Sequence, residues 1–211
     1  MGTNHMGRQS IRFPQPPVVR GFASVAGKKE REGPLGDQFT ATVQDTTFGE
    51  KSWERAERRM QQMTLELALE KAGLTDADLD AAFSGDLLNQ CIGSSFSLRN
   101  RGVPTLGLYG ACSTMAESLL LAAMSVSGGY ARTALAMTSS HFASSERQYR
   151  FPLGYGGQRT PTSQWTVTGA GAVLLGGGEC GIRITAATIG SIVDRGICDA
   201  NNMGAAMAPA A

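Results

Sequence analysis

Segments with strand-like and helix-like patterns alternate along this chain, and this alternation constrains the fold more than any other feature. Val18 to Ala26 mixes β-branched and small residues and ends at Gly27, which is typical of a strand. Apolar residues then recur three or four positions apart from Trp53 to Leu67, as on one face of an amphipathic helix. We expect this helix to begin at Ser52 as its N-cap and to end at Gly73.

The same alternation continues through the rest of the chain. Thr75 to Asp78 resembles a capping box and predicts a short helix, and apolar spacing from Ser113 to Ser127 predicts a longer one that ends at Gly128. Further segments have strand character: Ala81–Leu88, Thr105–Tyr109, Arg132–Met137, Trp165–Leu175 and Ile182–Ile192. A polar loop around Asn100 is expected between the first two, and His141–Ser163 is expected to be a long polar loop. Strands alternating with helices indicate an α/β fold with a mixed sheet and helices on its faces.

The composition places the chain in the ordinary globular class, with 42% hydrophobic and 18% charged residues. Nineteen basic and eighteen acidic side chains leave a formal charge of +1. No overall field therefore attracts nucleic acid, which is not expected as a partner. The longest apolar stretch, Ser118–Val126, is far shorter than the ~20 residues of a membrane-spanning helix, so no transmembrane segment is expected.

The four cysteines form no CxxC pair, and two histidines are too few to complete a zinc site. Reduced thiols in a cytosol-like compartment and no metal site are therefore expected. Met1–His5 lacks the parts of a signal peptide and is interpreted as cloning residue, so that the natural chain is expected to start at Met6.

The sharpest local feature is the turn at Tyr109–Thr114, where a predicted strand runs through small residues directly into a helix. At such a helix N-terminus the macrodipole and the free amide groups favour anions, including a cysteine thiolate. The amides beside Cys112 and Ser113 can also hold an anionic oxygen, which acyl transfer and carboxylate binding both require. A lone cysteine among small residues is also typical of a buried packing residue, so both interpretations stay open.

A second candidate region opens at Ser139-Ser140-His141, just after a predicted strand end, where ligands of open α/β sheets usually lie. It continues with three arginines within thirteen residues, interleaved with aromatic residues: Arg147, Arg150 and Arg159, with Tyr149, Phe151 and Tyr155. Arginines present planar donors to carboxylates, and aromatic rings present flat faces to a ligand ring. The alternative is a solvated loop whose aromatic side chains fold back on themselves.

The Gly-Ala-Cys-Ser-Thr turn at 110–114 resembles the nucleophile turn of thiolases and ketoacyl synthases. Two longer segments, one from Ser139 through Pro152 and the other WTVTGAGA from Trp165, resemble the stage V sporulation protein AD family much more closely. The earlier segments GFASVAGKKEREGPLGDQF and DTTFGEKSWERAERRM fit the same family. The resemblance therefore spans nearly everything after the tag.

This resemblance implies a thiolase-like α/β fold of two related halves, each with a five-stranded sheet, packed as a layered αβαβα domain. On that pattern, residues 6–180 are expected to form the N-terminal half, and residues 181–211 the start of a truncated C-terminal half. One sheet would then lack its packing partner and expose an apolar face. Weak solubility, altered oligomerisation or a companion fragment is therefore expected.

The resemblance also implies a role in sporulation. Family members are linked to uptake of dipicolinic acid (pyridine-2,6-dicarboxylate), alone or with calcium, into the developing spore, together with other stage V sporulation A membrane proteins. The expected location is the developing spore, soluble or peripheral at its inner membrane, and the full-length protein is expected to be a homodimer. Cys112 matches the thiolase nucleophile position. The arginine-rich segment matches a family segment, although the resemblance fixes no individual ligand contact.

The candidate ligand-binding residues are Cys112, Ser113, His141, Arg147, Arg150 and Arg159. The leading hypothesis is non-catalytic binding of the diacid without a cofactor. Thiolase-type enzymes take their catalytic histidine from the later half, and His141 does not match that position. The first alternative is an acyltransferase in which a thioester acylates Cys112, with coenzyme A or a carrier protein as cofactor. The second is a scaffold subunit of a spore membrane complex that needs no ligand.

Overall fold

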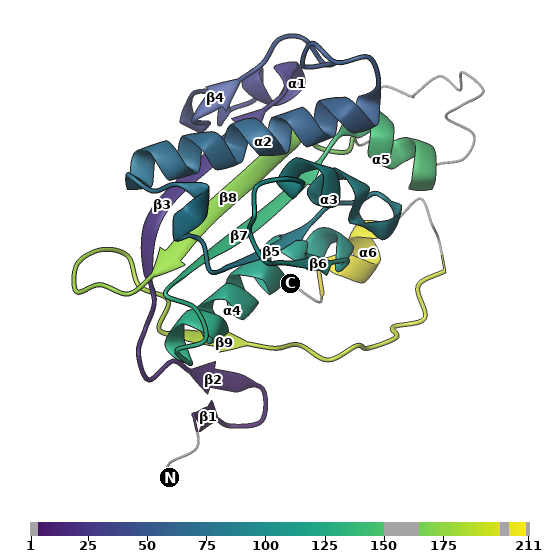
Figure 1. Ribbon diagram of the computed structural model, residues 1–211. Helices are drawn as coiled ribbons and strands as arrows, with labels where there is room; N and C mark the ends of the chain where they lie inside the picture. The colour runs from purple at the N-terminus through teal and green to yellow at the C-terminus, as the bar shows by residue number, and fades with distance from the viewer. Residues whose placement is uncertain (1–3, 150–164, 199–202, 210–211) are drawn as a thin grey trace. The chain divides into compact units, whose positions relative to one another are not determined.

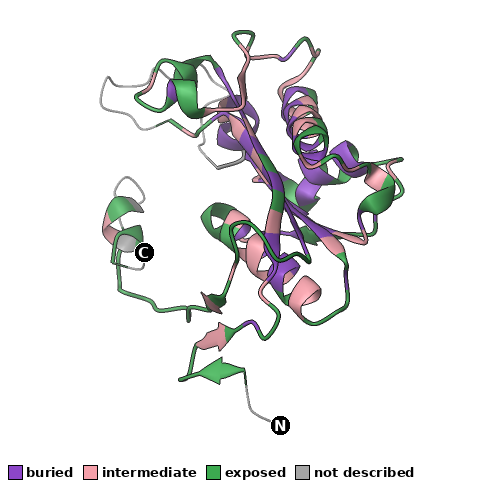
Figure 2. Ribbon diagram, turned by 90° about the vertical axis from the view of Figure 1, so that its left-hand side faces the viewer, coloured by how far each residue is buried: buried purple, intermediate pink, exposed green. Residues whose placement is uncertain are grey.

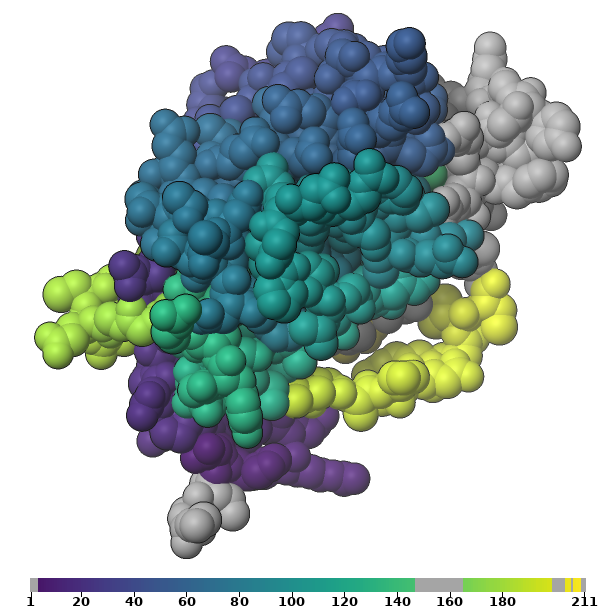
Figure 3. Space-filling model, viewed as in Figure 1, coloured from purple at the N-terminus to yellow at the C-terminus, as the bar shows by residue number. Residues whose placement is uncertain are grey.

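The computed structural model describes residues 4–149, 165–198 and 203–209 of the chain. The chain divides into two compact units, one of Phe13–Thr185 and one of Met1–Arg12 together with Ala186–Ala211. Figure 1 traces the elements of both units, and Figure 3 shows the surface from the same side. Every candidate site residue within the described ranges belongs to the larger unit.

The larger unit is built on a six-stranded mixed sheet with the order β4-β3-β8-β7-β5-β6. Its strands are β3 (Val18–Ala26), β4 (Ala41–Thr42), β5 (Ala81–Gly85), β6 (Thr105–Leu108), β7 (Thr133–Ser140) and β8 (Gly169–Gly176). β8 runs antiparallel to both β3 and β7, whereas the other pairings are parallel. The edge strand β4 has only two residues, so five longer strands form the body of the sheet. The predicted α/β class with a mixed sheet is confirmed.

Helices cover both faces of this sheet (Figures 1 and 2). They are α1 (Lys28–Arg31), α2 (Trp53–Ala72), α3 (Ile92–Leu98), α4 (Thr114–Ser127) and α5 (Phe142–Tyr149), with 3₁₀ turns at Gly36–Gln38, Asp76–Asp78, Asn89–Cys91 and Ala111–Ser113. α2 packs across β3 and β8, and α4 packs on β7 and β5. The sheet is thus the middle layer of a three-layer unit.

The main core lies between α2 and the sheet, where buried residues gather in Figure 2. Leu65 and Leu69 of α2 pack in one cluster with Met137 of β7. Ala23 of β3 and Ala172 of β8 belong to the same cluster, and their small side chains let α2 lie close to these strands. Burial of each large apolar side chain contributes about 1.5–3 kcal/mol, so this interface fixes α2 on the sheet.

α2 begins and ends at the residues that its sequence signals predict. The Ser52 hydroxyl accepts a hydrogen bond from the Arg55 backbone N–H at 3.4 Å. At the other end Gly73 has φ of 64°, the left-handed conformation that glycine adopts without steric cost. The predicted helix at Ser52–Gly73 is therefore confirmed.

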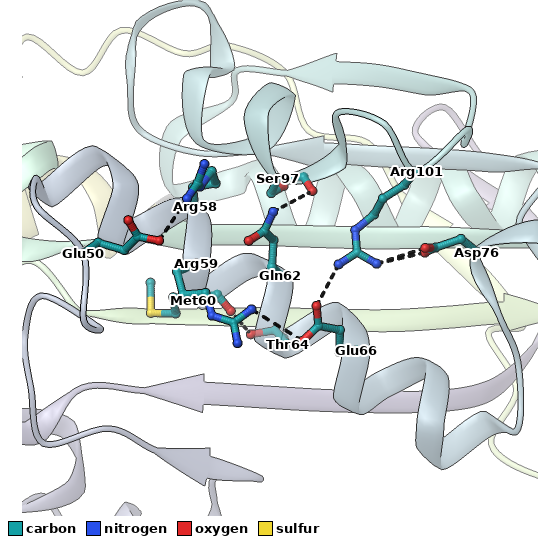
Figure 4. Close-up of polar contacts among 10 residues, drawn as sticks. All are labelled: Glu50, Arg58, Arg59, Met60, Gln62, Thr64, Glu66, Asp76, Ser97 and Arg101. Carbon is teal, nitrogen blue, oxygen red and sulfur yellow. Dashed lines mark hydrogen bonds and ion pairs between the residues drawn. The ribbon is translucent and has the colours of Figure 1, made fainter.

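Ion pairs on the exposed side of α2 tie the helix to neighbouring loops (Figure 4). Arg58 of α2 forms an ion pair at 2.9 Å with Glu50, which precedes the helix. Arg101, in the loop between α3 and β6, bridges Glu66 of α2 at 2.9 Å and Asp76 at 3.0 Å. Pairs of this kind contribute about 0–1 kcal/mol each, so they orient the loops more than they hold the fold.

Two helices occur where the sequence predicts loops. α3 lies in the predicted polar loop, and α5 occupies the start of the predicted loop His141–Ser163. The α3 sequence IGSSFSL is rich in serine and glycine, which are weak helix formers. Gln61 of α2 hydrogen-bonds to Ser94 and Ser97 of α3, so tertiary contacts hold this short helix.

The smaller unit contains a three-stranded antiparallel sheet with the order β1-β2-β9. Its elements are β1 (His5–Met6), β2 (Ser10–Arg12), β9 (Ala186–Thr188) and the short helix α6 (Met203–Met207). β9 covers only the middle of the strand predicted at Ile182–Ile192. The predicted boundary between the two halves, after residue 180, stays a prediction.

Among the described residues, no helix combines the length and the apolar character that crossing a membrane requires.

β5 ends at Gly85, where an added Cβ would collide with the carbonyl oxygen of Leu108 and the methyl group of Thr114. Gly85→Ala must therefore displace β6 or the start of α4, and we expect a loss of about 1–3 kcal/mol in the free energy of unfolding. Gly171→Ala in β8 is the matched control, because its Cβ meets no atom within 4 Å. Denaturant unfolding compares the two variants, and equal stabilities would contradict this close packing.

Candidate functional site

The parallel strands of the large sheet end at one common edge. β3 and β7 run in the same direction because β8 is antiparallel to both, and β5 and β6 run parallel to β7. Gly27 follows β3, Asp86 follows β5 and His141 follows β7, while Cys112 lies shortly after the end of β6. Ligands of open α/β sheets bind outside the carboxyl ends of the strands, so this edge is the candidate site.

Cys112 is an exposed free thiol in the turn that leads into α4. The preceding Ala111 has φ of 49°, a left-handed conformation that costs a non-glycine residue about 1–3 kcal/mol. The Ser113 hydroxyl donates to the Gly110 carbonyl at 2.8 Å and fixes the turn. In this chain Cys112 is therefore not a buried packing residue.

The turn presents Cys112 and Ser113 to solvent at the start of a 14-residue helix. In this turn the Ser113 N–H donates to the Gly110 carbonyl at 3.1 Å and the Thr114 N–H donates to the Ala111 carbonyl, so these two amides are paired. The dipole of α4 favours negative charge at this end of the helix. This arrangement can bind a carboxylate, and it can equally stabilise the oxyanion of a thioester reaction.

His141 is fully buried, and both of its ring nitrogens are hydrogen-bonded. The Ala143 N–H donates to Nδ1 at 3.2 Å, so the proton of a neutral ring sits on Nε2 and is donated to the Thr46 carbonyl at 2.8 Å. Burial lowers the pKa of His141, which keeps the ring neutral at pH 7. A ligand could reach its nitrogens only by displacing these contacts.

Of the three predicted arginines, only Arg147 lies within the described residues. Arg147 lies in α5, which follows β7 at the carboxyl edge, whereas Arg150 and Arg159 lie outside the described residues. The structure thus brings Cys112, Ser113, His141 and the helix that carries Arg147 to one edge of the sheet. Their contacts with a ligand stay a prediction.

A chain of hydrogen bonds between buried side chains joins α2 to the end of β7. Glu57 accepts from the hydroxyl of Ser139 in β7 at 2.8 Å and from the hydroxyl of Ser144 in α5 at 2.6 Å. Gln61, one turn further along α2, donates to Ser139 at 2.7 Å and accepts from Ser97 of α3 at 2.6 Å. These contacts fix the position of α5 relative to the sheet.

Burial raises the pKa of Glu57 to about 7, although the hydrogen bonds from Ser144 and Ser139 partly offset this rise. This network was not predicted from the sequence. A usable signal existed, because Glu57, Gln61 and Thr64 recur at helical spacing beside the apolar face of α2. Polar residues on such a face need buried partners.

No cluster of three or more histidine, cysteine, aspartate or glutamate side chains within the described ranges could hold a metal ion.

Several solved structures share this architecture. The chain is similar to the priming β-ketosynthase from the R1128 polyketide biosynthetic pathway, with a TM-score of 0.51 and 17% identity, over 83% of this chain and 54% of that chain. It is also similar to 3-oxoacyl-[acyl-carrier-protein] synthase III from Aquifex aeolicus VF5, with a TM-score of 0.51 and 17% identity, over 78% of this chain and 55% of that one. At such identities the likeness shows the fold alone. The protein therefore has the thiolase-like fold, as predicted.

The sequence relationships are more specific. The sequence profile of the family described as Stage V sporulation protein AD (SpoVAD) matches residues 7–211. Stage V sporulation protein AD of Bacillus subtilis (strain 168) is 45% identical over 205 residues, which cover 97% of this chain and 61% of that protein. The chain belongs to the stage V sporulation protein AD family, and it spans about 61% of the length of this relative.

The pKa of Glu57 predicts that stability depends on pH. The ordinary pKa of a glutamate is 4.5, so between this value and about 7 the folded state binds more protons than the unfolded chain. The free energy of unfolding should therefore fall by about 3 kcal/mol as the pH rises through this window. Glu57→Gln cannot ionise, and we expect denaturant unfolding to show no such fall for this variant.

Glu70→Gln is the matched control, because Glu70 lies exposed on the same helix. This variant should retain the pH dependence of the unchanged protein. If Glu57→Gln and the unchanged protein lost the same free energy of unfolding between about pH 5 and pH 8, the buried carboxyl would not titrate in this range.

Proposed function

We propose that this sporulation protein binds dipicolinic acid without chemical turnover, for its uptake into the developing spore. The observation that carries the proposal is the exposed turn at Cys112 and Ser113, which opens a 14-residue helix at the carboxyl edge of the sheet. Membership of the stage V sporulation protein AD family supports the biological setting. The activity of the whole protein is part of the proposal, because the chain spans about 61% of its relative.

The chemistry of the edge suits an aromatic diacid. One carboxylate would lie at the turn of Cys112 and Ser113, where the dipole of α4 favours negative charge. The second carboxylate would pair with arginines carried by α5 and the segment after it, because guanidinium groups bind carboxylates with two parallel hydrogen bonds. Arg147, Arg150 and Arg159 are the residues proposed for this role.

The contacts of His141 exclude it as a base for Cys112. A cysteine nucleophile requires a base to take its proton, and histidine is the usual partner. The chain has two histidines, and His5 belongs to the smaller unit. Both ring nitrogens of His141 are hydrogen-bonded, one to the Thr46 carbonyl and the other to the Ala143 N–H. His141 is therefore not available to Cys112 in this arrangement.

The partners are proposed on the same basis. Uptake of the diacid, alone or with calcium, would involve other stage V sporulation A membrane proteins at the spore inner membrane. A homodimer of the full-length protein is also proposed. Within the described residues β6 is an edge strand in which Thr105, Leu106 and Gly107 are exposed, and this supports a dimer because the edge of a strand can pair with a second copy. No role for nucleic acid is proposed.

An acyltransferase is the second candidate function. The exposed thiol of Cys112 and the thiolase-like fold both favour it, and its cofactor would be coenzyme A or a carrier protein. A scaffold function without a ligand would instead leave both the thiol and the arginines unused.

Arg147→Gln tests the binding proposal. Loss of a charge-assisted hydrogen bond costs about 1.5–3 kcal/mol, so the dissociation constant for dipicolinic acid should rise about 10-fold or more. Arg132→Gln is the matched control, because Arg132 pairs with Asp80 near the start of β7, at the opposite edge of the sheet. Calorimetric titration with and without calcium measures both variants. Equal affinities would remove Arg147 from the site, and no binding by the unchanged protein would contradict the proposed function.

Incubation with acyl thioesters separates the binding protein from the acyltransferase. We expect mass spectrometry to find no acyl adduct on Cys112, because the proposed binding is non-covalent. The Cys112→Ala variant measures acyl labelling at the other thiols. A stoichiometric adduct that Cys112→Ala abolishes would contradict non-catalytic binding and favour the acyltransferase.

A further inference from the structure

A pocket of about 220 Å³ lies at the carboxyl edge, apart from Cys112. Its lining includes Lys28 and Lys29 after β3, Phe142 after β7, and Trp165 and Thr168 before β8. The ends of β3 and β6 are four strand spacings apart, about 19 Å at ~4.8 Å per strand. A ligand of single-ring size could not fill this pocket and also reach the turn at Cys112.

Thr168 fixes the walls of the pocket. Its N–H donates to Oε1 of Glu30 at 2.9 Å, and its carbonyl accepts from the N–H of Gly27 at 2.8 Å. Its hydroxyl accepts from the Phe142 N–H at 3.1 Å. One residue thus joins the ends of β3 and β7 and the helix α1, and it is itself only 4% exposed. Such a junction holds the walls in place before a ligand arrives, which lowers the cost of binding.

His141 supports two of the walls from behind. Its Nε2 donates to the carbonyl of Thr46, which lines the pocket, and its ring stacks on Phe142 with centroids 5.0 Å apart. Trp53 packs on the other side of the cluster, 5.4 Å from the His141 ring. His141 is therefore a positioning residue for this pocket, which gives a role to a residue that the sequence singled out.

The pocket combines aromatic walls with an ammonium group. The Trp165 and Phe142 rings lie 5.7 Å apart, and Nζ of Lys29 stands 4.1 Å above the Trp165 ring. Lys28 adds a second ammonium group to the lining. The lining also includes Glu30 and Glu32. Glu30 is bound to Thr168 through Oε1 and its Oε2 has almost no accessible surface, so the accessible charged groups are Lys28, Lys29 and Glu32. The accessible charge of the lining is therefore net positive.

We infer that this pocket binds a planar aromatic carboxylate of single-ring size. The ring lies against Trp165 and Phe142, and the carboxylate pairs with Lys29, whose ammonium group needs only to turn from the ring face to the acid. The volume of about 220 Å³ is smaller than the about 300–1,000 Å³ of pockets for drug-sized ligands, which suits a ligand of single-ring size. The inference rests on the proposed function for its ligand class, and it adds a binding place distinct from the turn at Cys112.

Trp165 supplies a local probe. The chain contains two tryptophans, Trp53 and Trp165, so an isotope-labelled sample gives two indole N–H signals in its NMR spectrum. Trp165→Phe assigns them. We expect benzoate and pyridine-2,6-dicarboxylate to shift the Trp165 signal saturably and the Trp53 signal much less. Succinate lacks the ring and benzylamine lacks the acid, so each should bind at least about tenfold more weakly.

Lys29→Gln should weaken benzoate binding about tenfold, because it removes a charge-assisted hydrogen bond. Lys71→Gln is the matched control, since Lys71 stands over another aromatic ring, that of Phe22, at 5.4 Å. This control should bind benzoate as the unchanged protein does. Thermal unfolding of each variant confirms that it is folded.

The outcomes separate this inference from the proposed function. No shift with benzoate, equal affinity of Lys29→Gln and Lys71→Gln, or preferred binding of benzylamine would each overturn the inference. If dipicolinic acid binds with an affinity that depends on Arg147, and benzoate binding does not depend on Lys29, the proposed function stands and the pocket inference fails. If benzoate binds through Lys29 but dipicolinic acid binds nowhere, the inference stands and the proposed function fails.

Discussion

The antiparallel strand β8 is the constraint on which the larger unit depends. It is hydrogen-bonded to β3 on one side and to β7 on the other, so it joins the pair β4-β3 to the three parallel strands β7, β5 and β6. The small residues at its start, from Gly169 to Ala172, leave room for α2 to cover both neighbours. Thr168 directly precedes β8, which lies between β3 and β7. It therefore hydrogen-bonds both to Gly27 after β3 and to Phe142 after β7. The walls of the pocket follow from that geometry.

The same edge carries two kinds of chemistry at different places. Beyond β6 the strained turn exposes Cys112 at the N-terminal end of α4, where the helix dipole favours an anionic oxygen. Toward β3, aromatic rings and Lys29 offer stacking and a positive charge. Between them, Glu57 and its serine partners hold α5 against the sheet without a cation in the network. A buried carboxyl of this kind is most stable when protonated, which links the placement of α5 to pH.

Local signals determined how far the sequence could be interpreted. The bounds of α2 were predictable because Ser52 and Gly73 are caps that act within a few residues. The strand at Val18–Ala26 and the thiolase-like class were also correct. α3 was missed because its serines are held by Gln61, which is far away in sequence. The pocket was missed for the same reason, since Glu30 and Thr168 are 138 residues apart and meet only through the pairing of β3 with β8.

We expect an aromatic dicarboxylate to bind non-covalently at the carboxyl edge of the sheet. A crystal structure of the protein grown with pyridine-2,6-dicarboxylate is the first test. We predict ligand density at this edge, at the turn of Cys112 or in the pocket of Lys29 and Trp165, with no bond to Sγ of Cys112. Ligand density elsewhere on the molecule, no ligand at a saturating concentration, or a covalent adduct on Cys112 would contradict non-covalent binding at this edge.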